Sequence, residues 1–288
     1  MKVFTLPGTA PVNVLLTGEP DFVSEFADRL HKNNIPFGIL PNISSLDNLD
    51  LELEMLEPSI DPSVLDTMDY GEHASTIVED LRTEAGKFTH IVDLSISPPI
   101  DRKDTIEIAS LLNPEAVVMV SVLLGTATEM GMIANVDDRV TGITLVPSII
   151  TSATTVDMSR GLNTNDHFAL MGEQLLTSLG YTVERVEDRV ALVQMRILAM
   201  LINEAAFAVM EGVATPTDID NAMKLGVNYP KGLLAWADEI GIAIIVFILD
   251  GLYREYHQER YRPCVLLKQY MRAGWLGTIA GRGFYSYA

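Results

Sequence analysis

Three things are scarce in this chain: cysteine, positive charge and long apolar runs. One cysteine among 288 residues, Cys264, excludes an internal disulfide and a cysteine-based zinc site, and we expect no metal. Lys and Arg number 20 against 39 Asp and Glu, so the formal charge of −19 argues against a nucleic-acid partner. The longest uncharged apolar run of the C-terminal half, Gly241–Leu249, is far shorter than the roughly 20 residues that span a membrane.

The N-terminus also lacks the features of a targeting segment. The stretch MKVFTLPGTAPVNVLL has one lysine, and it has prolines where a signal peptide needs an apolar core. We therefore expect a cytoplasmic protein that has no contact with a membrane. With 48% hydrophobic and 20% charged residues the composition is that of a globular protein, and the length predicts about two domains.

The first 187 residues alternate between short apolar runs and helical patterns. Val12–Thr17 is an apolar run, Asp21–Lys32 repeats its apolar residues at helical spacing, and Ile35–Leu40 is a second apolar run. This strand–helix–strand order is typical of a parallel sheet. We expect further strands at His90–Ile96, Ala116–Leu124, Val140–Val146, Thr154–Met158 and Thr182–Val186, and helices at Glu72–Thr83, Asp101–Leu112 and Asp166–Leu179.

After Glu187 the pattern predicts helices alone. Ala191–Met210 is apolar nearly all round, which indicates a helix that is buried on most sides. Thr215 has the features of an N-cap, because Pro216 follows it and Asp218 lies in the first turn. Further helices are expected at Leu233–Ile240, Ile242–Tyr256 and Pro263–Ala273. Because this helical domain is so apolar, we expect it to bury part of its surface against another subunit.

The fold class predicted from these patterns is α/β. A Rossmann-like domain with a mostly parallel sheet is expected over residues 1–187, and an all-helical domain over residues 188–288.

The loop after the first predicted strand is a poor dinucleotide site. In such a site G-x-G-x-x-G joins strand to helix, because glycines let the backbone approach the pyrophosphate. Here Leu16 and Asp21 replace the outer glycines and Gly18 alone survives, while Glu19 adds a second negative charge that repels an anionic ligand. The acid that would hold the ribose hydroxyls falls at Pro41. We therefore expect no standard NAD site.

The C-terminal motifs resemble a known family. The strings ATPTDIDNAMKLG, YPKG and GRGFYSY are together similar to the C-terminal domain of the 3-hydroxyacyl-CoA dehydrogenases, in particular bacterial 3-hydroxybutyryl-CoA dehydrogenases. The resemblance implies a dinucleotide-fold domain followed by a helical domain that forms a homodimer. It also implies NAD-dependent oxidation of a 3-hydroxyacyl-CoA, in which a His–Glu pair removes the hydroxyl proton while Ser and Asn hold the substrate.

The family's functional positions can be followed onto this chain one at a time. The catalytic histidine falls on Thr144 and its glutamate on Asp157, while the serine falls on Leu123 and the later asparagine on Met195. A shift of the alignment cannot restore the histidine, because no histidine lies between residues 121 and 160. Without an imidazole this region has no base with a pKa near neutrality.

Residues 33–81 carry eleven Asp and Glu residues and no Lys or Arg. One interpretation is a solvated acidic excursion from the sheet, and the other is a surface for a basic partner. In the family, basic residues of this region help to hold the nucleotide phosphates of coenzyme A, and phosphate binding favours Arg or Lys.

Three hypotheses remain open from the sequence. In the first, the protein keeps the family's fold and dimer but has lost hydride transfer and its cofactor, and acts as a partner of a related dehydrogenase subunit or as a binding protein. In the second, it is an active 3-hydroxyacyl-CoA or 3-hydroxybutyryl-CoA dehydrogenase of fatty-acid metabolism that uses NAD. In the third, another chemistry occupies the same cleft. The degenerate loop and the missing histidine favour the first.

Overall fold

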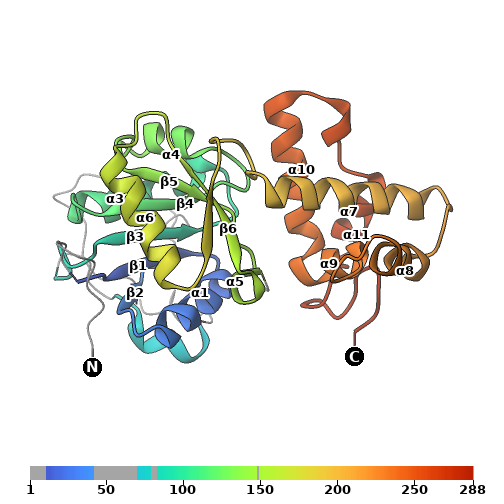
Figure 1. Cartoon of the computed structure of the whole chain (residues 1–288), viewed down its shortest axis with the longest axis horizontal. Coiled ribbons are helices and arrows are strands. Elements are labelled where there is room, and N and C mark those ends of the chain that lie inside the picture. Colours follow the sequence, from blue (N-terminus) through green and yellow to red (C-terminus); the bar gives the residue numbers. More distant parts are fainter. Residues whose placement is uncertain (1–10, 42–69, 79–82, 148, 288) are drawn as a thin grey trace. The chain divides into compact units, whose positions relative to one another are not determined.

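The computed structural model describes residues 11–41, 70–78, 83–147 and 149–287 (Figure 1). Contacts divide the chain into two compact units. Unit 1 comprises Met1–Leu145 and Ile149–Arg189, and unit 2 comprises Val146–Ser148 and Val190–Ala288. Most of the acidic stretch of residues 33–81 lies outside the described residues.

Unit 1 is built on one seven-stranded sheet of order β2-β1-β3-β4-β5-β6-β7. Neighbouring strands run parallel except β5 and β6, which are antiparallel, so the predicted mostly parallel sheet is confirmed. The strands are β1 Val14–Gly18, β2 Phe37–Ile39, β3 His90–Leu94, β4 Val117–Ser121, β5 Val140–Ile143, β6 Thr155–Arg160 and β7 Thr182–Arg185. Strands β1, β3 and β4 are buried on both faces, which explains their unbroken apolar runs.

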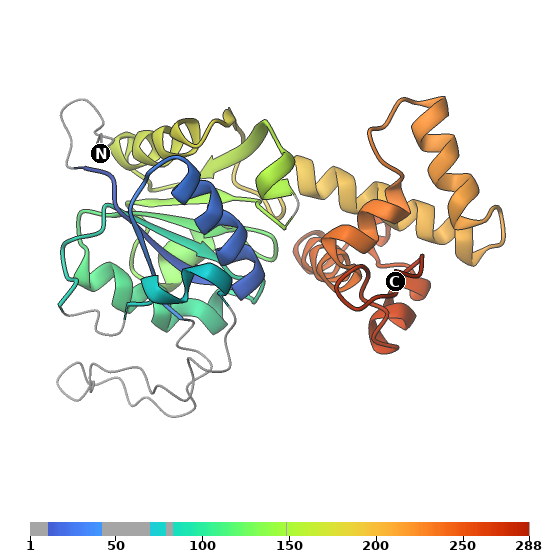
Figure 2. The same cartoon turned by 90° about the horizontal axis from the view of Figure 1, so that it is seen from below.

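Helices cover both faces of this sheet (Figure 2). The elements are α1 Pro20–Lys32, η2 Gly71–Thr76, η3 Pro99–Arg102, α3 Lys103–Leu112, α4 Ala127–Ile133, α5 Ile149–Ser152 and α6 Asp166–Ser178. Helix α1 buries the apolar stripe Phe22, Phe26 and Leu30 that its sequence spacing predicted. The prediction of a helix over Glu72–Thr83 is wrong for the residues that the structure describes there, because they form only the short 3₁₀ helix η2.

Unit 2 is helical, as the sequence predicted. Its elements are α7 Gln194–Met210, α8 Pro216–Gly226, α9 Leu233–Ile240, α10 Ile242–Tyr256, η4 Glu259–Tyr261 and α11 Val265–Arg272. Thr215 caps α8, since its hydroxyl accepts the Asp218 N–H. Helix α7 begins three residues later than expected, because Ala191 and Leu192 adopt positive φ angles that no helix allows.

Two buried aspartates of unit 2 explain the C-terminal motifs. Asp220 accepts the N–H groups of Leu234 at 2.8 Å and Ala235 at 2.9 Å, and so caps α9. Its carboxylate also accepts the Tyr285 hydroxyl at 2.8 Å. Asp220, the second aspartate of the D-I-D string, therefore joins α8, α9 and the C-terminal tail.

Asp238 fastens the same tail from α9. Its carboxylate accepts the backbone N–H groups of Phe284 and Tyr285, both at 2.9 Å, and the Tyr287 hydroxyl at 3.0 Å. A Cβ atom at Gly283 would collide with this carboxylate, so glycine is required there. The G-R-G-F-Y string thus forms a hydrogen-bonded hook, and its role is structural.

Candidate functional site

The carboxyl edge of the unit 1 sheet is the place where a fold of this kind holds ligands. Chain order reverses between β1 and β3, because β2 lies on one side of β1 and β3 on the other. Such a switch point leaves a crevice outside the carboxyl ends of the strands. The register sets Thr17 beside Asp93 and Gly18 beside Leu94 at this point.

The β1–α1 turn at the switch point is packed against the end of β3. Gly18 has φ +126°, and a Cβ atom there would collide with the backbone of Leu94 and Ser95. Of the outer loop positions, Leu16 is fully buried within β1 and Asp21 is exposed in the first turn of α1. The surviving glycine is therefore explained by packing between strands alone.

Glu19 is the half-buried acidic residue that immediately precedes α1 at this switch point. Burial raises the pKa of Glu19, and the charges of Asp93 and Asp21 raise it further, while the backbone of Ile96 opposes the shift. The sequence indicated the charge of Glu19 but not its burial.

Tyr70 stands close enough to Glu19 to feel its charge. Burial, with a smaller contribution from the Glu19 carboxylate, raises the pKa of Tyr70 to about 12. No local sequence pattern marks this tyrosine as part of the edge. Pro41, two residues after β2, is buried and provides no carboxylate for a ribose.

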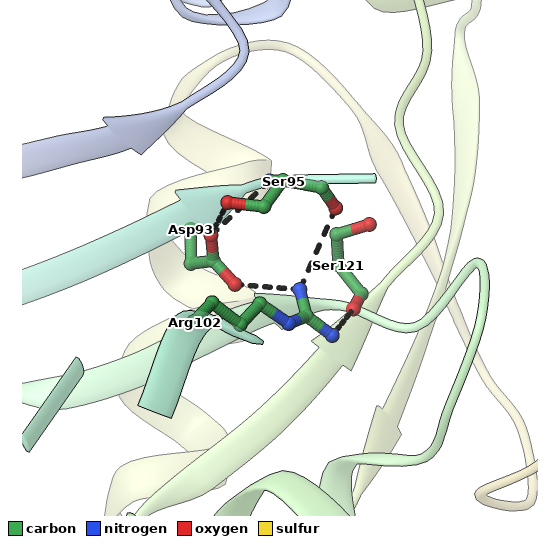
Figure 3. A network of polar contacts seen from close by, with 4 residues as sticks. All are labelled: Asp93, Ser95, Arg102 and Ser121. Carbon is green, nitrogen blue, oxygen red and sulfur yellow. Dashed lines mark hydrogen bonds and ion pairs between the residues drawn. The ribbon is translucent and has the colours of Figure 1, made fainter. Parts of the chain in front are cut away.

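A buried ion pair between Arg102 and Asp93 lies at the carboxyl ends of β3 and β4 (Figure 3). Arg102, 1% exposed, donates to Asp93 at 2.6 Å and to the Ser121 carbonyl oxygen at 2.6 Å. Asp93 also accepts the Ser95 hydroxyl at 2.6 Å and its backbone N–H at 3.1 Å. The guanidinium is thereby committed to an internal carboxylate, so it does not offer its charge to a ligand phosphate.

Of the four positions to which the resemblance assigns functional residues, three lie in unit 1. Continued by one residue, the β5–β6 register places Thr144 opposite Asp157. Both are buried, at 3% and 4% exposure. Leu123 follows β4 at the same edge and is fully buried. The residue before it, Val122, still donates its N–H to the Ile143 carbonyl oxygen of β5 at 3.0 Å. Met195 lies in the first turn of α7, in unit 2.

Histidines are found elsewhere. His90 opens β3 and therefore lies at the opposite, amino end of the strands. Burial lowers the pKa of His90 to about 4, although its ring hydrogen-bonds the Met171 carbonyl oxygen at 3.2 Å. His73 contacts Asp28 of α1 at 2.7 Å. His31, His167 and His257 lie on α1, on α6 and at the end of α10.

What the edge does offer is hydroxyl groups. In the described part of the chain, the buried side-chain oxygens of Thr17, Ser97, Ser121 and Thr144 have no hydrogen-bond partner. They lie at or just beyond the ends of β1, β3, β4 and β5. Hydroxyls can donate or accept hydrogen bonds, but they do not titrate near neutral pH.

Among the described residues, no cluster of three or more His, Cys, Asp and Glu side chains is arranged to hold a metal ion. Within the same residues, no helix has the length and apolar character needed to cross a membrane.

Comparisons with known proteins agree with this architecture. The family model described as the 3-hydroxyacyl-CoA dehydrogenase C-terminal domain matches residues 193–287. A Bacillus subtilis protein named "Probable 3-hydroxybutyryl-CoA dehydrogenase" is 34% identical over 225 residues, which cover 78% of this chain and 74% of the relative. The chain belongs to the 3-hydroxyacyl-CoA dehydrogenase family. The resemblance in the C-terminal motifs is thereby confirmed.

Other members of the 3-hydroxyacyl-CoA dehydrogenase family are similar to this chain. The 3-hydroxybutyryl-CoA dehydrogenase of Bradyrhizobium diazoefficiens is 35% identical over 188 residues, 65% of this chain and 64% of that one. The crystal structure of M. tuberculosis FadB2 aligns with a TM-score of 0.78 at 22% identity, over 96% of this chain and 98% of that chain. The structural likeness confirms the fold class.

Proposed function

We propose that this protein is a 3-hydroxyacyl-CoA dehydrogenase homologue that has lost hydride transfer and acts as a dimeric binding protein or partner subunit. What supports the proposal is the buried pair of positions Thr144 and Asp157, to which the resemblance assigns the family's His–Glu pair and which the β5–β6 register, continued by one residue, sets opposite each other. Neither a hydroxyl nor a carboxylate that lacks an imidazole partner supplies a base matched to neutral pH. Removal of the hydroxyl proton is the step that is lost.

The cofactor end of the edge supports the same proposal. A dinucleotide needs backbone N–H groups free to receive its phosphates. Here Glu19 immediately precedes α1 and Asp21 adds a second negative charge in its first turn, so this helix N-terminus repels an anionic ligand. Pro41 leaves the ribose without its usual acid. We infer that NAD is not held in the family's manner.

The alternative is an active 3-hydroxybutyryl-CoA dehydrogenase that uses NAD. It is favoured by the reach of the similarity to the Bacillus subtilis relative, which at 225 residues extends well beyond the C-terminal domain. In that case Asp157 would serve as the base, and the cofactor phosphates would have to bind beside Glu19 and Asp21. The third hypothesis, another chemistry at this edge, has no specific observation in its favour.

The partner that we propose is a second copy of this chain, bound through unit 2. Helix α7 exposes Ile197 (54%) and Met210 (42%), and its N-cap Val193 is 45% exposed, although the other face of the helix is buried. The remaining exposed large apolar side chains of this unit include Val213, Leu225, Val227, Val265 and Ile279. Apolar surface on this scale favours an interface. A related dehydrogenase subunit would fit the same surface.

A turnover assay decides between the first two hypotheses. The full chain is mixed with acetoacetyl-CoA and NADH, and oxidation of NADH is followed by absorbance beside an active 3-hydroxybutyryl-CoA dehydrogenase. We expect no oxidation above the rate without protein. A rate of NADH oxidation that saturates with both acetoacetyl-CoA and NADH would establish the alternative. Sedimentation at micromolar concentration tests the dimer separately, and a monomer alone would contradict that part.

A further inference from the structure

The carboxyl edge of the unit 1 sheet gathers most of the buried polar groups that lack a hydrogen-bond partner. In the described part of the chain seven side-chain atoms are of this kind, and five of them lie at or just beyond this edge. The other two, in Ser110 and Thr141, lie within α3 and within β5. The five at the edge are the hydroxyls of Thr17, Ser97, Ser121 and Thr144 and the Nε–H group of Arg102.

Polar groups of this kind are uncommon in folded proteins, because burial without a partner costs free energy. Their concentration at one edge therefore indicates a function and not a random defect of packing. We propose that this edge binds an uncharged nucleoside, whose hydroxyl, carbonyl and amino groups supply the missing hydrogen bonds. This assignment rests on the proposed function of a binding protein without hydride transfer, and it specifies the class of the ligand.

The hydroxyls form a row along four neighbouring strands. Strands β1, β3, β4 and β5 are adjacent in the sheet, and each ends in or is followed by one of the four hydroxyls. Three spacings of about 4.8 Å between strands give the row a length of about 14 Å, which suits a nucleoside better than a whole dinucleotide. Because protein atoms cover these oxygens in this structure, binding requires local opening of the edge, and association is expected to be slow.

Arg102 adds one donor to this row without adding an unbalanced charge. Its Nη1 group donates to Asp93 and its Nη2 group to the Ser121 carbonyl oxygen, each at 2.6 Å. Its Nε–H group has no partner among the residues that the structure describes. Figure 3 shows the Ser121 hydroxyl directed away from the guanidinium, so the two unpaired groups do not satisfy each other. Hydroxyls and a single N–H group suit the acceptors and donors of a neutral ligand.

The charge beside the row disfavours phosphate groups. Glu19 immediately precedes α1, and Asp21 lies in its first turn, at the same switch point. The nearby Asp93 has its charge balanced by Arg102 at 2.6 Å, so the guanidinium is not free for an anion. A sheet of this kind holds nucleotides at its switch point, but here the phosphates are repelled while the sugar and base are not. A nucleoside is what remains of such a ligand.

Calorimetric titrations of the full chain with three probes test the ligand class. Adenosine is uncharged and carries the ribose hydroxyls, dideoxyadenosine lacks the hydroxyls of the ribose ring, and ADP adds phosphates. We expect saturable binding of adenosine and weaker binding of the other two probes. Absence of adenosine binding, or tighter binding of ADP, would contradict the proposal.

A matched pair of threonines tests the unpaired hydroxyls without any ligand. Thr144 and Thr164 are both 3% exposed, but the Thr164 hydroxyl donates to the Val140 carbonyl oxygen at 2.5 Å. Thr164→Val breaks a buried hydrogen bond and should lower the melting temperature of unit 1 by about 2–4 °C in scanning calorimetry. Thr144→Val removes a hydroxyl that has no partner and should leave the melting temperature unchanged or raise it.

The same variants connect the hydroxyls to binding. Thr144→Val, Thr17→Val and Ser121→Ala should each weaken adenosine binding about threefold to tenfold, which corresponds to one neutral hydrogen bond, while Thr164→Val should leave it unchanged. If Thr144→Val and Thr164→Val lose equal stability, the Thr144 hydroxyl serves the fold and the proposal is wrong. Turnover of NADH by the wild type would overturn the proposed function, whereas missing adenosine binding without turnover would overturn the ligand class alone.

Discussion

The two units place their buried acids in different settings. In unit 2, Asp220 and Asp238 bind backbone N–H groups and tyrosine hydroxyls of the same unit. In unit 1, Asp93 lies at the sheet edge where a ligand would bind, and it pairs with Arg102. The motifs that identify the family therefore hold unit 2 together, whereas most of the positions to which the resemblance assigns its chemistry lie in unit 1.

This difference separates ancestry from activity. The residues that identify the chain as a 3-hydroxyacyl-CoA dehydrogenase homologue, such as Asp220 and Gly283, hold the helices and the C-terminal tail of unit 2 together. A change of side chain at Thr144 should leave the sheet intact, because β5, which precedes it, is buried and paired through its backbone.

The largest expected effect concerns the ion pair of unit 1. Arg102→Met leaves the buried Asp93 carboxylate without its cation and should lower the free energy of unfolding by about 3–5 kcal/mol. Urea unfolding followed by far-UV circular dichroism measures the change. Because a buried pair can often be replaced as a whole, Asp93→Asn combined with Arg102→Met should recover most of the loss. A single variant as stable as the wild type would show that the edge is not held by this pair.

The next effect concerns the hook of unit 2. Asp238→Ala leaves the N–H groups of Phe284 and Tyr285 and the Tyr287 hydroxyl without an acceptor, and it should cost about 3 kcal/mol. The chain's two tryptophans, Trp236 and Trp275, both lie in unit 2, so their fluorescence reports the unfolding of that unit.

The control for this variant is Asp250→Asn on α10. Asp250 pairs with Lys268 at 2.9 Å, but its side chain is 39% exposed, so the loss should be below about 1 kcal/mol. Equal losses in the two variants would mean that the C-terminal string is not the structural element described above.

The smallest effect is a dependence of unit 1 on pH. The pKa of His90 falls from 6.5 to about 4 on folding, so between these pH values His90 is protonated in the unfolded chain and neutral in the folded chain. Stability is therefore complete above about pH 6.5 and declines as the pH falls toward 4, by about 2 kcal/mol between pH 7 and pH 5.

Urea unfolding of unit 1 at the two pH values measures this decline. His90→Gln should lose most of the pH dependence, while His257→Asn, which changes an exposed histidine of unit 2, should keep it. An unchanged slope in His90→Gln would assign the acid sensitivity to other groups.

Much of the fold could be predicted because its causes are local. Phe22, Phe26 and Leu30 repeat at helical spacing and are buried on α1, and Thr215 caps the helix that follows it. The start of α7 was misplaced because the positive φ angles of Ala191 and Leu192 are unusual for such residues and leave no mark in an apolar run.

The site was predictable only in what it lacks. The absence of histidine near Thr144 is a property of the sequence, and so is the charge at Glu19. The close packing of Gly18 against Leu94 and Ser95 joins distant parts of the chain and arises from strand order. Likewise Arg102 has the appearance of a surface charge at a helix start and Asp93 lies in a strand, and only the sheet shows that they are buried together.

Gly18 has a wider consequence for recognising cofactor sites. Its lack of a side chain is required by the neighbouring strand, whether or not a nucleotide ever reaches the turn. Such a glycine is retained because a side chain in its place would collide with the neighbouring strand, whatever its effect on a ligand. A lone glycine in such a turn therefore records how the strands meet, and it should carry no weight when a chain is searched for the ability to bind NAD.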